Sequence, residues 1–483
     1  MDAICVRRVV DIEDEATPDL VKLFPPDLKA DIMLAKLLSP IEPNNTSLAL
    51  LDQVIHALDG LSCPETEETR RQQHLRIARA IAPQYGHKCS SKRSKDSESH
   101  RSPAQALAQN ILCGAIALGN LPLVRLLLAE GSEADINETT IHFGRPLALA
   151  AVWGHIDIVQ YLLANGADSQ AVTDLGHRKT SKVSVGFSPI AASNSGDLYD
   201  SRSPAGSALR AAMLGGHGDV VRLLLQPEHR IPVGRREYFA AMTAGARFSR
   251  LELIKLLWDI YEKDTGKYLS GHPYAGKTML WEAATYGHHG VLDFLLDNGI
   301  DVNAAASSRR GTPVPTGRTA IQRAAASNRI DTVRFLLDRG ANLYWDDGYL
   351  NTMVTAAMCG HEEIVDLCLE HGGRPKRALR AAAEQGQAHL VRRLLQRYPR
   401  LLNRNSVKNA FYCAALHNEL QVAKVLVEAG LDAEKLMVFD LPVGPSSVTL
   451  PYSKYTVPLD GHVFRLRNGV YADRRTWEWV GKY

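Results

Sequence analysis

Apolar and polar positions along the chain repeat as a unit of two short segments joined by a turn. In the clearest copy, residues 146–168, an alanine-rich segment ends at Gly154, and Ile158, Val159 and Leu162 follow at the spacing of one helix face. The pattern predicts an α-helical chain built from repeated helix pairs. Clear further copies lie at residues 207–225, 278–303, 319–343, 352–373, 377–399 and 409–432, with a weaker copy at 111–137 and a degenerate one at 237–259.

Each copy contains the same three parts. The first segment carries small residues, such as Ala150 and Ala151, which allow neighbouring helices to approach closely. A glycine, often followed by histidine, then ends that helix, since glycine tolerates positive φ. The second segment can be aligned on one apolar position, and several of its spacings are close to 33 residues. That position is occupied by Val124, Val159, Val221, Ile254, Leu292, Val333, Val365, Val391 and Ala423.

These features resemble the ankyrin repeat, with its T-P-L-H-x-A-A helix start, G-H turn and V-x-L-L-L second helix ending in G-A-D. The resemblance covers roughly residues 105–434 in about nine copies, although the histidine of T-P-L-H is absent from its place. It implies an all-α repeat fold, the ankyrin solenoid, in which stacked neighbours build one continuous core. It also implies a protein partner bound on the concave face.

The segments flanking the array have different patterns. Residues 1–84 contain three amphipathic stretches and predict a helical region that caps the first repeat; an F-box-like docking module is the alternative. Residues 85–104 are polar and rich in serine and lysine, as in a disordered linker. Residues 435–483 are rich in β-branched and aromatic residues, with an Asn-Gly hairpin signal at Asn468, and predict a small β-rich appendage.

Three insertions separate the second helix of one repeat from the first helix of the next. They lie at residues 172–203, 263–276 and 304–317, where an ankyrin repeat projects its β-turn finger. Long loops inside a compact array are uncommon and are often functional. We therefore expect these fingers to lie beside the binding site.

Composition narrows the class of protein. The formal net charge of +3 over 483 residues is too small to make the whole chain an electrostatic binder of nucleic acid or membranes. No stretch approaches the roughly 18 apolar residues of a membrane span, and the first residues lack the apolar core of a secretory signal. The seven scattered cysteines fit free thiols. We expect a cytoplasmic or nuclear protein without a metal site.

One motif resembles a nucleotide-binding loop. Residues 271–278 match GxxxxGK[ST], but such a loop binds phosphate only between a strand and a helix. The preceding residues do not have the pattern of a buried strand, and residues 317–319 open the next repeat in the same way. We therefore expect no nucleotide, no cofactor and no binding of nucleic acid.

The sequence favours a non-catalytic scaffold or adaptor that binds another protein, since it contains no HExxH, G-x-S-x-G or Rossmann motif. Two alternatives stay open. One is an enzyme or accessory protein of a small-molecule biosynthetic pathway with an unrecognised pocket. The other is a substrate adaptor of a ubiquitin ligase.

Two groups of residues are candidates for partner binding. In ankyrin folds the residue before the turn glycine faces the groove, and here it is a large aromatic in two repeats; Trp281 opens the same helix as one of them. With the basic residues of the neighbouring insertions, the first group is Trp153, Trp281, Tyr286, Arg178, Lys179, Arg309 and Arg310. Residues 376–404 hold eight basic residues and one acid, Glu384, which predicts a patch for an acidic partner. That patch consists of Arg377, Arg380, Arg393 and Arg397.

Overall fold

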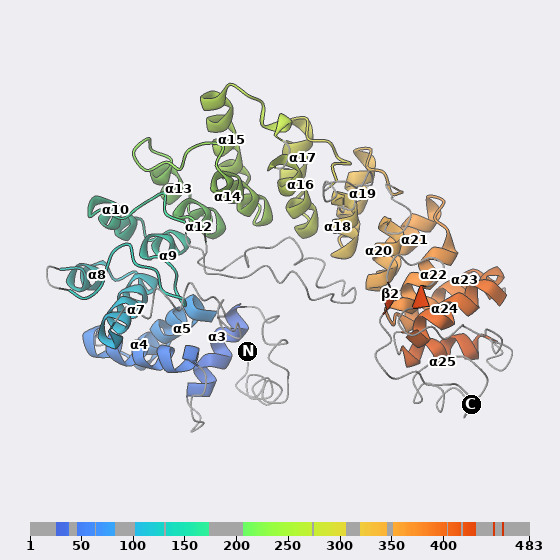
Figure 1. The fold of residues 1–483 in the computed structure, drawn as a ribbon, viewed down its shortest axis with the longest axis horizontal. Helices are drawn as coiled ribbons and strands as arrows, with labels where there is room; N and C mark the ends of the chain where they lie inside the picture. The colour runs from blue at the N-terminus through green and yellow to red at the C-terminus, as the bar shows by residue number, and fades with distance from the viewer. Residues whose placement is uncertain are drawn as a thin grey trace. The chain divides into compact units, whose positions relative to one another are not determined.

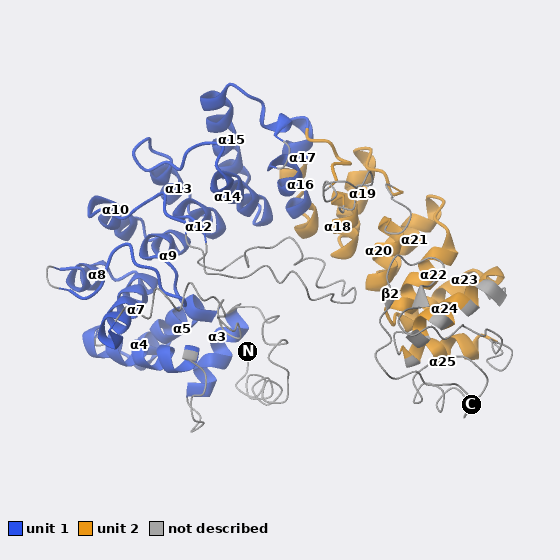
Figure 2. Ribbon diagram, viewed as in Figure 1, with its two compact units in different colours: residues 1–186, 194–283, 293–299 blue, residues 187–193, 284–292, 300–483 orange. Residues whose placement is uncertain are grey.

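The computed structural model describes most of the helical part of the chain. The described residues are 26–37, 46–62, 64–82, 102–129, 132–172, 206–272, 275–305, 319–344, 351–402, 404–416 and 419–430, with 448–449 and 456–457. Helices dominate these residues (Figure 1). They divide into two compact units: residues 1–186, 194–283 and 293–299 form unit 1, and residues 187–193, 284–292 and 300–483 form unit 2 (Figure 2).

Three helices precede the repeats: α3 (Pro26–Leu37), α4 (Thr46–Ser62) and α5 (Glu67–Ile81). Both α4 and α5 pack against α7 (Pro103–Leu118), the first helix of the array. The approach is close, because a Cβ atom added at Gly114 of α7 would lie 2.7 Å from Leu58 Cδ1 and 2.8 Å from Val54 Cγ1. This packing favours the interpretation of residues 1–84 as a cap.

Nine helix pairs follow in the described part of the chain. The first helix of each pair is α7, α9 (Pro146–Trp153), α12 (Ala208–Gly215), α14 (Arg236–Arg247), α16 (Ala275–Tyr286), α18 (Ala320–Ala326), α20 (Thr352–Cys359), α22 (Pro375–Glu384) and α24 (Arg404–Leu416). The second is α8 (Leu121–Leu127), α10 (Ile156–Ala164), α13 (Gly218–Leu224), α15 (Leu251–Thr265), α17 (His289–Asp297), α19 (Ile330–Asp338), α21 (Glu362–Glu370), α23 (Ala388–Arg397) and α25 (Leu420–Glu428).

The core of each unit follows the repeated pattern. The nine aligned second-helix residues, from Val124 to Ala423, are all completely buried, which confirms the predicted apolar stripe. The alanines of the first helices, among them Ala150 and Ala151, are also fully buried. Their small side chains let adjacent first helices lie side by side, as α9, α12 and α14 do in unit 1 (Figure 1).

The first helices end in a left-handed residue that is tied to the next repeat. Gly154 has φ of 75°, and a Cβ atom at this position would collide with the ring of His217. Glycine is therefore required here both by its backbone conformation and by the close approach of the next turn. Two repeats use other residues in the same conformation, Ser249 at φ of 58° and Asn328 at φ of 55°.

The fourth repeat differs from the prediction. The sequence predicts an inserted loop at residues 263–276, but α15 continues to Thr265, a 3-10 helix η2 covers Leu269–Gly271, and α16 begins at Ala275. The longer helix is stabilised by burial of Trp258 and Tyr261 near its end. The other two predicted insertions lie almost wholly outside the described residues.

The C-terminal tail gives little evidence for the predicted appendage. Strands β1 (Val448–Thr449) and β2 (Thr456–Val457) pair antiparallel, with Val448 opposite Val457. The rest of residues 435–483, including the predicted hairpin at Asn468, lies outside the described residues. A β-rich appendage therefore stays a prediction. A second 3-10 helix, η3 (Pro399–Leu402), joins α23 to α24 in unit 2.

Candidate protein-binding surface

The ends of the first helices are fixed by hydrogen bonds between successive repeats. In unit 1, His217 Nε2 donates to Val152 O at 3.0 Å, and Arg250 Nη2 donates to Gly215 O at 3.1 Å. In unit 2, His361 Nε2 makes the corresponding bond by donating to Ala326 O at 3.1 Å. The turn histidines are therefore structural groups, and burial lowers the pKa of the His361 imidazole.

These bonds hold the last residue of each first helix in a defined place. In unit 1 that residue is Trp153 on α9, Gly215 on α12 and Phe248 at the end of α14, each directly before the left-handed residue of the turn. All three residues are half-buried. Because α9, α12 and α14 are adjacent, two aromatic residues flank a position that carries no side chain.

Gly215 can only be glycine in this arrangement. A Cβ atom there would collide with the Val152 carbonyl and with the ring of His217. The Val152 carbonyl and the His217 ring occupy this position, so Trp153 and Phe248 are separated at this level by backbone and a histidine ring and not by a side chain of α12. We call Trp153, Gly215 and Phe248 the aromatic row.

Sequence analysis missed Phe248. The fourth repeat has Ser249 where the pattern expects glycine, so its turn was not aligned with the others. The structure shows Ser249 in the left-handed conformation, with φ of 58°, followed by Arg250 in the place of the turn histidine. The sequence holds only a weak signal for this turn, the alanines Ala244 and Ala246 shortly before Phe248, since Gly245 stands where the neighbouring repeats have Ala150 and Ala212.

The other predicted aromatics lie on α16. Trp281 and Tyr286 are both half-buried, and the Tyr286 ring stacks on His288 with centroids 6.2 Å apart. Trp281 belongs to unit 1 together with Trp153, whereas Tyr286 belongs to unit 2. The structure therefore does not join Trp153 and Tyr286 into one surface. The basic residues Arg178, Lys179, Arg309 and Arg310 lie outside the described residues and stay a prediction.

The basic patch of the eighth repeat is largely engaged within the protein. Arg393 Nη1 donates to Glu362 at 2.7 Å and its Nη2 donates to Asp366, while Arg397 Nη1 donates to the other Asp366 oxygen at 2.7 Å. Asp366 raises the pKa of the Arg393 guanidinium further above its usual range.

The other two arginines of that patch lie on α22. Arg377 is exposed, and the half-buried Arg380 makes a side-chain hydrogen bond with Cys413. The excess charge seen in residues 376–404 is therefore partly neutralised by acids of the preceding repeat. Binding of an acidic partner at this patch stays a prediction.

Residues 271–278, which resemble a nucleotide-binding loop in sequence, do not lie between a strand and a helix. The residues before it form α15 and η2, and Lys277 and Thr278 lie inside α16. Thr278 Oγ1 donates to Ala275 O at 2.9 Å and lies 3.2 Å from Thr243 Oγ1 on α14. Thr278 is thus part of the contact between two helices, and the strand that such a loop follows is replaced by helix.

The described residues also bear on metal sites and membrane spans. No group of three or more His, Cys, Asp or Glu side chains among them is placed to hold a metal ion. None of the described helices is long and apolar enough to cross a membrane. Burial raises the pKa of the Cys113 and Cys368 thiols to about 12, so these two cysteines are unreactive packing residues.

A comparison with family models decides the class of protein. The model described as "Ankyrin repeats (3 copies)" matches residues 74–173, 208–306, 238–347 and 353–436, which is more than half of the chain. The chain belongs to the ankyrin-repeat family. Ankyrin repeats are protein–protein interaction modules, and the stacked helix pairs with their left-handed turns are the fold of that family.

Known ankyrin-repeat proteins match this chain only in part. "Ankyrin repeat and KH domain-containing protein mask-1" of Caenorhabditis elegans is 25% identical over 367 residues, which cover 74% of this chain and 12% of that protein. "Ankyrin repeat, SAM and basic leucine zipper domain-containing protein 1" of Ovis aries and of Bos taurus is 34% identical over 90 residues, which cover 18% of this chain and 17% of each relative.

A solved structure with the same kind of repeat also matches. The human ASB11 ankyrin repeat domain shares 21% identity and a TM-score of 0.35, over 55% of this chain and 97% of that chain. The chain thus spans a small part of the length of the curated relatives, and most of the length of this solved domain.

Proposed function

We propose that this ankyrin-repeat protein is a non-catalytic scaffold or adaptor that binds a protein partner through the ends of its first helices in unit 1. The observation that carries the proposal is the aromatic row. Trp153 and Phe248 occupy the same register on helices separated by α12, whose residue in that register is Gly215. Large aromatic residues that stay partly exposed are typical anchors of protein interfaces.

The geometry supports partner binding over a purely structural role for these rings. Trp153 and Phe248 are half-buried, whereas the alanines one turn earlier on the same helices are buried in the core. The hydrogen bonds from His217 and Arg250 already hold the helix ends, so the rings are not needed to form the turns. Trp281, inside α16, is another half-buried aromatic residue of unit 1.

The test compares partner capture by the full-length chain with capture by the double variant Trp153→Ala, Phe248→Ala. Captured proteins are identified by mass spectrometry, and the affinity of the main partner is then measured. Truncation of an aromatic anchor costs about 2 kcal/mol, or roughly 30-fold in affinity, so the double variant should lose the partner. Its melting temperature should stay close to that of the unmodified chain.

Tyr161→Ala is the matched control. Tyr161 is a half-buried aromatic residue of the same repeat as Trp153, but it lies on the second helix α10, covered by the Arg125 guanidinium 5.4 Å from its ring. This variant should keep the partner. Loss of stability in the double variant, or retained binding, would mean that the rings are structural. Turnover of a small molecule by the purified chain would instead favour the biosynthetic alternative.

We also propose a reducing compartment, the cytoplasm or nucleus, for this protein. The support is that Cys113, Cys368 and Cys413 are buried thiols without a disulfide. A fluorescent fusion of the full chain, viewed in its own cells, tests this directly; secretion into the medium would contradict it.

A further inference from the structure

A second surface lies at the opposite end of the fourth repeat from Phe248. Here the start of α14 lies beside the end of α15, since the Phe239 ring is 5.6 Å from the Tyr261 ring and 4.1 Å from the His272 ring. Five exposed residues gather at these two helix ends, and we call them the Tyr268 edge. They are Arg235, Arg236, Lys263, Lys267 and Tyr268.

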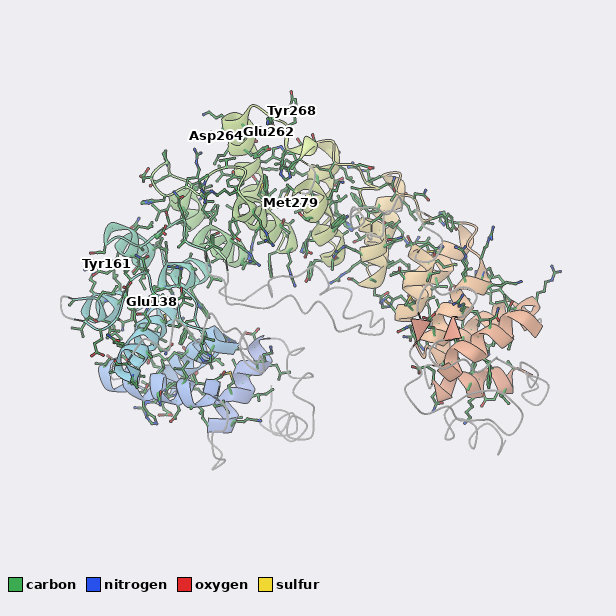
Figure 3. All side chains as sticks on the ribbon, viewed as in Figure 1. Glu138, Tyr161, Glu262, Asp264, Tyr268 and Met279 are labelled. Atoms are coloured by element: carbon green, nitrogen blue, oxygen red, sulfur yellow. The ribbon has the colours of Figure 1, made fainter. Side chains whose placement is uncertain are left out.

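Tyr268 is held outward by its surroundings. Its side chain is 80% exposed, the highest value among the large hydrophobic side chains described as exposed, while its neighbour Leu269 is fully buried. Glu262 fixes this turn, because its Oε1 accepts from Trp258 Nε1 at 2.9 Å and from the Leu269 amide at 3.1 Å. In Figure 3 the Tyr268 side chain points away from the ribbon. The ring is therefore exposed on a rigid turn.

The acids near the Tyr268 edge are mostly occupied within the repeat. Asp264 pairs with Arg230 at 2.8 Å, and Glu262 accepts the two bonds above (both acids are labelled in Figure 3). Glu237 is the only acid of α14; it is buried and accepts from the Ser207 amide at 3.2 Å. Glu228 and Asp259, which lies on α15 four residues before Lys263, are also exposed. Four exposed cations around one exposed aromatic residue thus outnumber these two carboxylates, and positive charge stays in excess.

We propose that the Tyr268 edge docks an acidic peptide segment of a protein partner, with a large apolar side chain of that segment packed against Tyr268. The cations attract the acidic residues and speed association, and the aromatic ring supplies the anchor. Single-stranded nucleic acid fits this edge less well, because such binding uses several aromatic platforms along a basic groove. The site is separate from the aromatic row and does not depend on it.

The experiment selects short random peptides from a display library on the immobilised full-length chain. Counter-selection against the double variant Lys267→Glu, Tyr268→Ala removes peptides that bind elsewhere. The recovered peptides should be rich in Asp and Glu and contain a large apolar residue. Their affinity should fall about tenfold or more in Tyr268→Ala and in Lys263→Glu, and it should fall with added salt.

Three controls make the outcome decisive. Tyr268→Phe keeps the ring and should retain binding, and so should Arg334→Glu, which reverses an exposed charge on α19 of unit 2. Trp153→Ala should also leave these peptides bound, which separates this site from the aromatic row. Recovery of no peptide after counter-selection, recovery of peptides without acidic residues, or equal competition by a single-stranded oligonucleotide would each overturn the proposal.

Discussion

At the scale of single residues, the turn glycines determine how one repeat meets the next. Gly154 and Gly166 both have positive φ, 75° and 90°, but their surroundings differ. A Cβ atom at Gly154 would collide with His217 of the next repeat, while no atom lies within 4 Å of the same position at Gly166. Substitutions at these two glycines therefore distinguish the cost of backbone strain from the cost of disturbing the contact between repeats.

Gly154→Ala should destabilise unit 1 by about 3 kcal/mol or more, because strain and collision act together. Gly166→Ala should cost only the strain, about 1 kcal/mol. Denaturant unfolding of both variants, followed by circular dichroism, measures the difference. Equal losses would show that the approach of His217 to Gly154 does not matter for stability.

His142 gives the protein a pH-dependent stability. Burial lowers the pKa of its imidazole from 6.5 to about 4, and its Nδ1 is buried without a hydrogen-bond partner among the described residues. Above pH 6.5 the ring is neutral in both the folded and the unfolded chain. As the pH falls from 6.5 towards 4, the unfolded chain binds a proton that the folded chain does not, so stability is lost in this window.

At pH 5 this single group should lower the free energy of unfolding by about 2 kcal/mol relative to pH 7. His142→Gln should therefore have a clearly shallower pH dependence between pH 7 and 5. His229→Gln, which replaces a half-buried histidine of unit 1, serves as the control. If His142→Gln and the unmodified chain lose stability equally between pH 7 and 5, protonation of another group causes the loss.

At the scale of helices, the N-terminal region provides the clearest test of packing. Val54 and Leu58 of α4 lie so close to Gly114 of α7 that their side chains must shift to admit even a Cβ atom there. Gly60 lies on the same helix α4, but nothing lies within 4 Å of its Cβ position. The two glycines form a matched pair for testing whether α4 caps the array.

Gly114→Val should destabilise unit 1 by about 1–3 kcal/mol, because overpacking forces α4 away from α7. Hydrogen exchange of α4 and α5 should rise in the same variant. Gly60→Val should be neutral or slightly stabilising, since glycine is a poor helix former. Unchanged exchange in Gly114→Val would count against the cap and in favour of an independent docking module.

The helices also show where sequence reasoning succeeds. The apolar stripe of the second helices was predictable, because stacking demands a buried residue at the same place in every repeat, and Val159 and Val391 are both fully buried. The charge of the eighth repeat is only partly visible in its own sequence. Asp366 of the preceding repeat, on α21, accepts from both Arg393 and Arg397, and an acidic partner at this patch stays a prediction.

At the scale of the whole chain, repetition fixes the family while single repeats determine the site. The ankyrin class could be predicted because the pattern recurs, and a match to the family model confirms it. Phe248 and the longer α15 could not be predicted, because both belong to the repeat that departs furthest from the pattern. Their positions depend on the backbone conformation of Ser249 and on hydrogen bonds of Arg250 and Glu262, which are specific to this repeat and do not follow from the repeated pattern.

The central claim is that a protein partner binds at the first-helix ends of unit 1. Its most direct test is hydrogen exchange of the full-length chain, alone and in complex with the partner identified by capture. The account predicts slower exchange at the ends of α9, α12 and α14, around Trp153, Gly215 and Phe248, and little change along the second helices α10 and α13. Protection confined to the second helices, or to unit 2, would contradict it.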